Sequence, residues 1–272
     1  MAPRPSHSLP GLSVRRDGVR AVTRSLPEEW PVALVYDGTT QAVMMASPAD
    51  LEDFALGFSL TEGVIETPDQ VEDFELVTHE AGCEARFWLA PGRRAALQQR
   101  RRRMTGPVGC GLCGIDSLEQ ALRPLPWVAS GLRLDQAELA HATDALRARQ
   151  PLHDQTHAVH AAGFLRPGAG IVLAREDVGR HNALDKLIGA MARQDIDPAG
   201  GAIVMTSRIS VELVQKCAMA GCPVLIAVSA PTAHAVRLAD GAGLTLAAFA
   251  RSGAFDLYSH PDRIQTGASD VA

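Results

Sequence analysis

Residues 202–249 read AIVMTSRISVELVQKCAMAGCPVLIAVSAPTAHAVRLADGAGLTLAAF, and this segment sets the expected architecture. Three short apolar runs alternate in it with two segments of helical spacing. The runs are 202–206, 224–228 and 244–249, and the intervening segments are 210–220 and 232–241. Runs of this length are typical of buried strands. The β-α-β-α-β order predicts a mostly parallel sheet covered by helices.

The sequence upstream extends the same α/β pattern. An amphipathic helix is predicted over 135–150, strands over 160–164 and 170–176, and another helix over 182–192. These elements cover both faces of the predicted sheet. We therefore expect a three-layer αβα domain over residues 135–264, followed by a flexible tail at 265–272.

A smaller α+β domain is predicted over residues 21–134. Strands at 31–36 and 40–45 flank Asp37-Gly38, a pair typical of tight hairpin turns. Ser47 and Pro48 suit the N-cap and first position of a helix. Two more strands are expected at 74–77 and 86–89. Residues 1–20 contain several prolines and no periodicity, so they are expected to form a flexible leader.

Composition excludes several classes of protein. The chain has 272 residues, with 46% hydrophobic and 21% charged residues, as in globular proteins with a sizeable core. Its net charge of −5 gives no chain-wide basic field for nucleic acid. It contains neither an apolar run long enough for a membrane helix nor a secretory signal. Five cysteines, an odd number, favour reduced thiols and a cytoplasmic location. Neither a membrane nor a nucleic-acid partner is expected.

Two of the cysteines lie in the segment Cys110-Gly-Leu-Cys113-Gly114. The spacing fits a zinc knuckle, a dithiol redox motif, a sulfur carrier or two buried structural cysteines. A zinc site would need a second pair of ligands. Cys217 and Cys222 do not supply it, because they have neither the spacing of a zinc knuckle nor polar surroundings. Glycines on both sides favour a thiol loop that can approach two partners closely. Cys110 and Cys113 are therefore candidate nucleophiles. A nucleophilic role requires a cationic group or a helix N-terminus near the thiol.

Hydroxyl and arginine side chains follow several predicted strands. The carboxyl edge of a parallel sheet is where such folds bind ligands, and helix N-termini there suit phosphate. These residues suggest a nucleotide-like ligand, although none forms a Walker or dinucleotide motif. For the residues around Arg180, the alternative is an ordinary start of the predicted helix 182–192, capped by Asn182 and stabilised by ion pairs. The candidates are Arg180, His181, Thr206, Ser207, Arg208, Ser229, Phe249, Ala250, Arg251, Ser252, Gly253 and Ala254.

Six arginines lie between Arg93 and Arg103. Their forked guanidinium groups match phosphate geometry, so the cluster could bind a phosphate-rich ligand or acidic partner. A solvated helix face is the alternative interpretation. At His160-Ala161-Ala162 the glutamate of a zinc deaminase signature is missing, which argues against deamination.

Taken together, these motifs resemble the FdhD family of formate dehydrogenase accessory sulfurtransferases over residues 22–264. Beyond the cysteine segment, the resemblance rests on Thr23-Arg24, Thr61-Glu62-Gly63, residues 176–186 (EDVGRHNALDK), Thr206-Ser207-Arg208 and Ser229-Ala230-Pro231-Thr232. One departure is Ala158-Val159, where the family usually has two glycines before the histidine. This difference concerns the shape of that turn, not the thiol chemistry.

The resemblance implies a function that composition and spacing do not. Members of the family take sulfur from a cysteine desulfurase and deliver it to the molybdenum of the bis(molybdopterin guanine dinucleotide) cofactor for formate dehydrogenase. Cys110 would then hold a persulfide, Cys113 would assist it, and residues 249–254 would bind the cofactor. The resemblance also implies a cytidine-deaminase-like C-terminal fold, a homodimer and no structural metal. The alternative is a non-enzymatic nucleotide-binding chaperone with structural cysteines.

Overall fold

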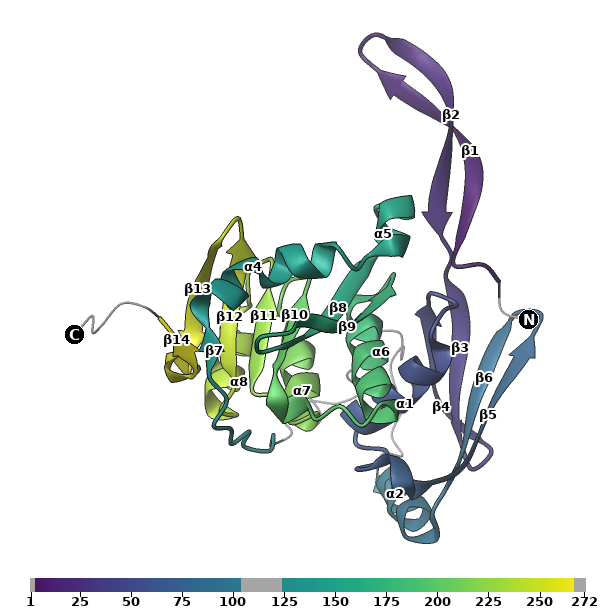
Figure 1. The fold of residues 1–272 in the computed structure, drawn as a ribbon. Coiled ribbons are helices and arrows are strands. Elements are labelled where there is room, and N and C mark those ends of the chain that lie inside the picture. Colours follow the sequence, from purple (N-terminus) through teal and green to yellow (C-terminus); the bar gives the residue numbers. More distant parts are fainter. Residues whose placement is uncertain (1–2, 104–123, 267–272) are drawn as a thin grey trace.

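The computed structural model describes residues 3–103 and 124–266. Its largest sheet has six strands in the order β13-β12-β11-β10-β8-β9 (Figure 1). The strands are β8 (His160–Arg166), β9 (Gly170–Asp177), β10 (Ala202–Met205), β11 (Val224–Ala227), β12 (Thr245–Arg251) and β13 (Ala254–Ser259). The accompanying helices are α4 (Gln136–Arg147), α5 (Pro151–Thr156), α6 (Arg180–Arg193), α7 (Val211–Met219) and α8 (Ala233–Gly241). The predicted helices and strands of this region are thus present.

The expectation of a mostly parallel sheet is wrong. Only β10, β11 and β12 run parallel, whereas β8, β9 and β13 are attached through antiparallel pairings. The reason lies in the connections. β8 joins β9, and β12 joins β13, through turns too short for a crossover helix, and short turns enforce antiparallel pairing.

Side chains alternate between two cores on either face of this sheet. Ile203 and Met205 face the cluster formed with α6, α7 and α8, whereas Ala202 and Val204 face the cluster that contains α4. This alternation follows from the two-residue period of a strand. The result is three layers, α/β/α (Figure 1).

A second sheet has four strands in the order β4-β3-β6-β5. They are β3 (Trp30–Tyr36), β4 (Thr39–Ala46), β5 (Val71–His79) and β6 (Gly82–Leu89). Asp37 and Gly38 have positive φ at the predicted hairpin turn. One face of the sheet packs on α1 (Leu51–Thr61), and Leu97 of α2 (Pro91–Arg103) completes that core. The described residues also form the short strands β7 (Leu134–Asp135) and β14 (Ile264–Gln265) and the 3₁₀ turns η1 (Pro68–Gln70), η2 (Pro198–Gly200) and η3 (Pro261–Arg263).

The predicted cap of α1 is incorrect. The helix begins at Leu51 after Asp50, which has a left-handed φ of 53° and makes no side-chain cap bond. Ser47 lies outside the helix because its backbone and hydroxyl bond to the segment before α6 instead. This long-range contact overrides the local capping preference.

The two sheets are joined through α1 and α6. A Cβ on Gly57 of α1 would overlap the carbonyl oxygen of Asp185, and a Cβ on Gly189 of α6 would overlap that of Asp53. Glycine at both positions therefore allows the two helix backbones to touch. The four-stranded unit therefore packs directly against the α/β/α unit through this close crossing.

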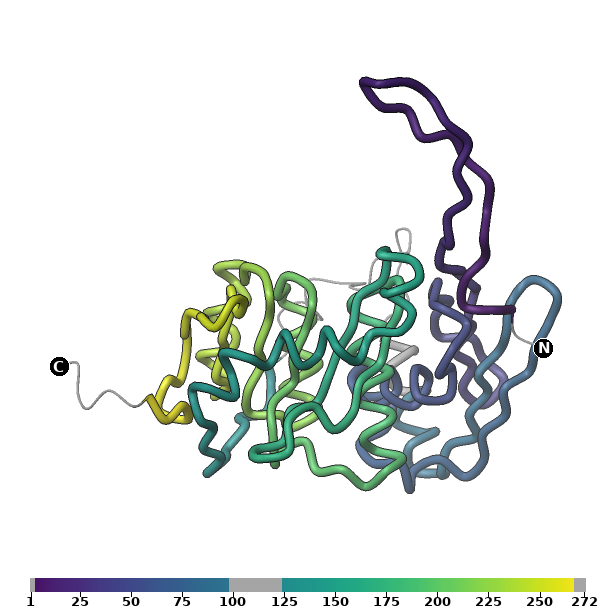
Figure 2. The backbone as a smooth tube through the Cα atoms, turned by 45° about the horizontal axis from the view of Figure 1, so that its top comes forward, coloured from purple at the N-terminus to yellow at the C-terminus, as the bar shows by residue number. Residues whose placement is uncertain are grey.

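Residues 1–20 were expected to be a leader without secondary structure, and that expectation is wrong for the residues described. β1 (Ser6–Arg15) and β2 (Gly18–Pro27) pair in full register as a long antiparallel hairpin. We call Ser6–Pro27 the hairpin arm. The arm projects away from both sheets (Figures 1 and 2). Prolines at positions 5, 10 and 27 obscured the alternating pattern because proline weakens a strand prediction.

Candidate functional site

The ends of β10, β11 and β12 converge, as predicted. The N–H of Val228 donates to the carbonyl of Met205 (3.1 Å), and the N–H of Phe249 donates to that of Ser229 (3.4 Å). The loops beyond these strands are tied as well, because the N–H of Ile209 donates to Ala230 (3.2 Å). We call this region the carboxyl edge.

β8 and β9 bring further side chains to the carboxyl edge, since β8 runs antiparallel to β10 and begins where β10 ends. The Thr206 hydroxyl accepts a hydrogen bond from the N–H of Ala161 (2.9 Å), and its oxygen lies 3.4 Å from Nδ1 of His160. Burial lowers the pKa of His160, and the positive charge of Arg180 lowers it further. His160 is therefore neutral near pH 7.

Arg180 and His181 form the first turn of α6 at the same edge. Nε2 of His181 lies 3.4 Å from the Ser210 hydroxyl and 3.7 Å from a Glu212 carboxylate oxygen. Burial, followed by repulsion from Arg180, lowers the pKa of His181 to about 4. The positive charge of Arg180 thus lowers the pKa of both histidines, which favours the neutral form of both rings.

The other candidates differ in what they offer a ligand. Ser207 is buried, and its hydroxyl donates to the carbonyl of Arg208 (2.9 Å), whereas the Arg208 side chain is exposed. Ala250 is also buried, and its carbonyl accepts from the Thr143 hydroxyl (2.7 Å), so this residue belongs to the core. Arg251 is exposed at the β12–β13 turn.

That turn has an unusual backbone. Phe249, Ser252 and Gly253 have φ values of 52°, 54° and 78°, and Phe249 keeps 37% of its side chain exposed. Ser252, Gly253 and Ala254 are exposed as well. The turn therefore presents backbone groups, an aromatic ring and an arginine to solvent beside the helix N-termini.

Segment 176–186 contains a buried ion pair that sequence patterning did not predict. Lys186 and Asp177 are both fully buried and form an ion pair with Nζ and Oδ2 2.7 Å apart. Both also bond to the backbone of Ser47: Nζ donates to its carbonyl (2.9 Å), and the carboxylate accepts from its N–H (2.9 Å). Asn182, expected to cap α6, instead donates to Met45 (2.7 Å) and Asp177 (3.0 Å). We call Ser47, Asp177, Asn182 and Lys186 the buried polar cluster.

A neighbouring buried group also joins α6 to α1. Asp185 accepts from the Thr61 hydroxyl (2.7 Å) and from Lys216 (3.0 Å), and Lys216 also bonds to Glu62 (2.9 Å). Most polar residues of segment 176–186 therefore hold the two units together. Arg180 and His181 are the ones that remain at the carboxyl edge.

The cysteines divide into two groups. Cys110 and Cys113 lie outside the described residues. The three described cysteines, Cys83, Cys217 and Cys222, are buried. Burial raises the pKa of Cys83 to about 11 and that of Cys222 to about 12, and burial followed by the nearby Cys222 raises that of Cys217. None of the three described thiols is suited to nucleophilic attack.

The arginine cluster is only partly described. Arg93 donates to the carbonyls of Val64 and Gly63 and pairs with Glu66 (3.0 Å), while Arg94 pairs with Asp37 (3.0 Å). These two guanidinium groups bind their own chain, so they are neither a purely solvated face nor free for a ligand. Over the described residues, no three His, Cys, Asp or Glu side chains are grouped closely enough to hold a metal. The described helices are also too short or too polar to cross a bilayer.

These features define an α/β protein whose carboxyl edge, with three arginines and the N-termini of α6, α7 and α8, suits an anionic ligand. Residues 27–265 match the model of the FdhD/NarQ family. The chain is 50% identical to a "sulfur carrier protein FdhD" of Agrobacterium fabrum over 92% of its length and 93% of that protein. It is 52% identical to the protein of that name from Xanthomonas oryzae pv. oryzae, over 89% and 86% of the two chains. The chain belongs to the FdhD/NarQ family.

A solved structure has the same fold. It is that of a putative formate dehydrogenase accessory protein from Desulfotalea psychrophila, with a TM-score of 0.76 and 24% identity. The match covers 96% of this chain and 99% of that one. At this level of identity the likeness concerns the fold alone.

Proposed function

We propose that the chain is a sulfurtransferase that carries sulfur as a persulfide on Cys110 and delivers it to a molybdenum-bound bis(molybdopterin guanine dinucleotide). The observation that supports this most directly is the burial of Cys83, Cys217 and Cys222, each with a raised pKa. The other two of the five cysteines in the sequence, Cys110 and Cys113, lie outside the described residues and are the remaining candidates. Family membership and the name of the relatives, sulfur carrier, support the same role.

The loading step is a thiolate exchange. The Cys110 thiolate attacks the outer sulfur of a persulfide on a cysteine desulfurase, whose own cysteine leaves as a thiolate. A new S–S bond forms as the old one breaks, so no external oxidant is needed. Release is proposed to occur when the Cys113 thiolate attacks Sγ of Cys110: the bond to the outer sulfur breaks, that sulfur leaves as sulfide towards the cofactor, and a Cys110–Cys113 disulfide forms. A dithiol reductant then restores both thiols.

The carboxyl edge is proposed to hold the substrate through its phosphates. A dinucleotide of this kind carries several negative charges, and arginine forks bind phosphate oxygens in pairs. Arg180, Arg208 and Arg251 supply such charges, and the exposed ring of Phe249 can stack on a base. Ser207 and Ala250 are proposed to contribute through the backbone, because their side chains are occupied or buried.

The proposed client is formate dehydrogenase, and a homodimer is the proposed assembly. The experiment that tests the function is complementation. A strain that lacks its own copy of the gene should regain formate dehydrogenase activity with the wild-type chain and with Cys83→Ser, but not with Cys110→Ala. Full activity with Cys110→Ala would favour the alternative, a chaperone that binds the nucleotide without carrying sulfur.

A further inference from the structure

Arg180 is a half-buried cation at the carboxyl edge. Over the described residues, its guanidinium forms no ion pair. The first turn of α6 has no acidic residue, whereas that of α7 contains Glu212. The guanidinium and the N-terminus of α6 therefore place two sources of positive potential together, and an anion is the partner that suits both.

His181, the next residue, uses one nitrogen of its ring within the fold. Nε2 lies 3.4 Å from the Ser210 hydroxyl, while Nδ1 has no hydrogen bond to any residue that the structure describes. The charged groups that act on this ring come from α1, α6 and α7, and they are Arg180, Glu212, Lys216 and Glu62. Burial and the charge of Arg180 prevail over the two carboxylates, so the ring stays neutral while no ligand is bound.

His160 at the start of β8 repeats this arrangement. Its Nδ1 lies 3.4 Å from the Thr206 hydroxyl, and its Nε2 has no hydrogen bond within the described part of the chain. The groups whose charges act on this ring are Arg180, His153 of α5 and Asp177 of β9. Asp177 is already paired with Lys186. Arg180 therefore favours the neutral form of two rings, each of which has one nitrogen left for a ligand.

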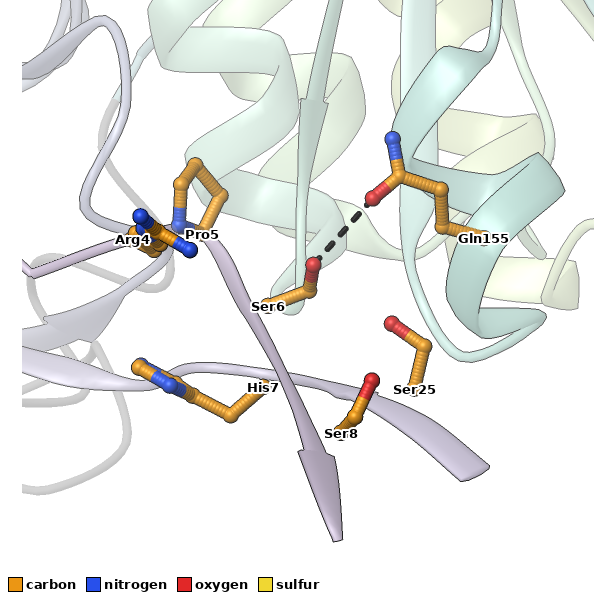
Figure 3. Close-up of a pocket in the computed structure, with 7 residues that line it drawn as sticks. All are labelled: Arg4, Pro5, Ser6, His7, Ser8, Ser25 and Gln155. Atoms are coloured by element: carbon orange, nitrogen blue, oxygen red, sulfur yellow. Dashed lines mark hydrogen bonds between the residues drawn. The ribbon is translucent and has the colours of Figure 1, made fainter. Parts of the chain in front are cut away.

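α5 and the base of the hairpin arm adjoin the start of β8. The N–H groups of Leu152 and His153 donate to the Glu176 carboxylate (2.8 Å each), so this carboxylate is engaged at the N-terminus of α5. On the far side of α5, the Ser6 hydroxyl donates to Oε1 of Gln155 (3.2 Å), beside a cavity of about 510 Å³ (Figure 3). Among the described residues, none that lines this cavity carries a carboxylate. The acidic groups on this side therefore leave Arg180 without a counter-ion.

We propose that His181 and His160 each take a proton from solvent when a pyrophosphate binds at Arg180, and that the two charged rings then hold its oxygens. The proposed function, on which this rests, supplies the ligand, a guanine dinucleotide bound through its phosphates. A negative charge beside an imidazole favours the protonated ring and offsets the effect of Arg180. Protonation gives each ring a second N–H, on the nitrogen that lacks a partner, and such a charged donor binds phosphate oxygen strongly.

Binding must then depend on pH in a defined direction. The complex holds more protons than the free chain and the free ligand, so the nucleotide binds more tightly as the pH falls. If the pKa of the His181 ring rises from about 4 to 6.5 in the complex, the affinity at pH 5.5 is about tenfold that at pH 8. Protonation of His160 would add to this effect.

Calorimetry with GDP-mannose measures both the affinity and the proton uptake. This probe is suitable because its two phosphates are fully ionised above pH 5, so the ligand itself does not titrate. Titrations in buffers that differ in their heat of ionisation give the number of protons taken up. His181→Gln should lose most of the uptake and of the pH dependence, and His160→Gln/His181→Gln should lose the rest. His79→Gln, in the four-stranded sheet, is the matched control and should keep both.

A second measurement uses the wild-type chain alone. The ring resonance of His181, assigned by its absence from the spectrum of His181→Gln, should titrate near pH 4 in the free chain and near pH 6.5 with saturating GDP-mannose. Binding without proton uptake, a His181 resonance that the nucleotide leaves unchanged, full uptake in the double variant or no binding at either pH would each overturn the proposal. Sulfur loading on Cys110 is measured separately, so the proposed function can hold where this proposal fails.

Discussion

Lys186 and Asp177 form an ion pair 2.7 Å long in which neither side chain has any exposed surface, and both bond to the backbone of Ser47, which directly follows β4 of the four-stranded sheet. Charges are buried at a high cost unless every polar atom finds a partner. Here the carboxylate also accepts from Gly179 and Asn182 (2.8 and 3.0 Å). The pair therefore joins the four-stranded unit to the helix that presents Arg180 and His181.

Lys186→Met is expected to destabilise the protein by about 3–5 kcal/mol, because it leaves Asp177 charged, buried and without its cation. Urea unfolding followed by circular dichroism measures the loss. Arg147→Ala removes the cation of an exposed pair with Asp154 and should cost about 0–1 kcal/mol. Equal effects of the two substitutions would show that the buried pair does not join the units.

Gly57→Ala tests the crossing of α1 and α6. Alanine normally stabilises a helix relative to glycine by about 1 kcal/mol. At position 57 the new Cβ would meet the Asp185 backbone, so we expect a loss of about 3 kcal/mol instead. Gly92→Ala in α2 is the matched control, since no atom lies within 4 Å of its Cβ position, and it should be neutral or stabilising. Thermal melts compare the two, and a stabilised Gly57→Ala would refute the tight crossing.

His181 predicts how stability depends on pH. Its pKa is about 4 in the folded chain against an ordinary 6.5, so between these values the unfolded chain binds more protons. Stability therefore falls as the pH is lowered from about 6.5 towards 4. His181→Gln, which leaves Arg180, Glu62, Glu212 and Lys216 in place, should lose less stability between pH 7 and pH 5 than the wild type. Urea titrations of the wild type and of His181→Gln at both pH values measure the two losses of stability. Equal losses would contradict this prediction.

Much of the α/β/α unit was predictable because its strands and helices have clear apolar periods. The positions of Thr206, Ser229 and Arg251 at one edge followed from the order of elements. Three features were not predictable from local pattern. Ser47 looked like an N-cap because its partners, Asp177 and Val178, lie 130 and 131 residues away.

Segment 176–186 was harder to interpret, since a polar residue that binds a ligand and one that joins two units look alike in sequence. The signal that could have separated them is the presence of an aspartate and a lysine among the apolar residues of α6. Asp185 and Lys186 sit among Leu184, Leu187 and Ile188, where charged side chains must be paired within the fold. The hairpin arm was missed because its prolines at positions 5, 10 and 27 weaken a strand prediction.

Arg251→Ala tests the carboxyl edge as a nucleotide site. If its guanidinium makes a charged hydrogen bond to phosphate, the loss should be about 1.5–3 kcal/mol, or roughly 10- to 150-fold in the dissociation constant for guanosine diphosphate. Isothermal titration calorimetry measures it. Arg166→Ala, at the opposite end of β8, is the matched control and should bind as the wild type does. Unchanged affinity in Arg251→Ala would remove this residue from the site.

The most direct test is to map the acquired sulfur. The chain is incubated with a cysteine desulfurase and cysteine, trapped with an alkylating reagent and digested for mass spectrometry. One extra sulfur atom is expected on the peptide that contains Cys110, also in Cys83→Ser, and none on the peptides of Cys217 and Cys222. Sulfur found on a buried cysteine, or undiminished loading of Cys110→Ala, would contradict the assignment of Cys110 as the carrier.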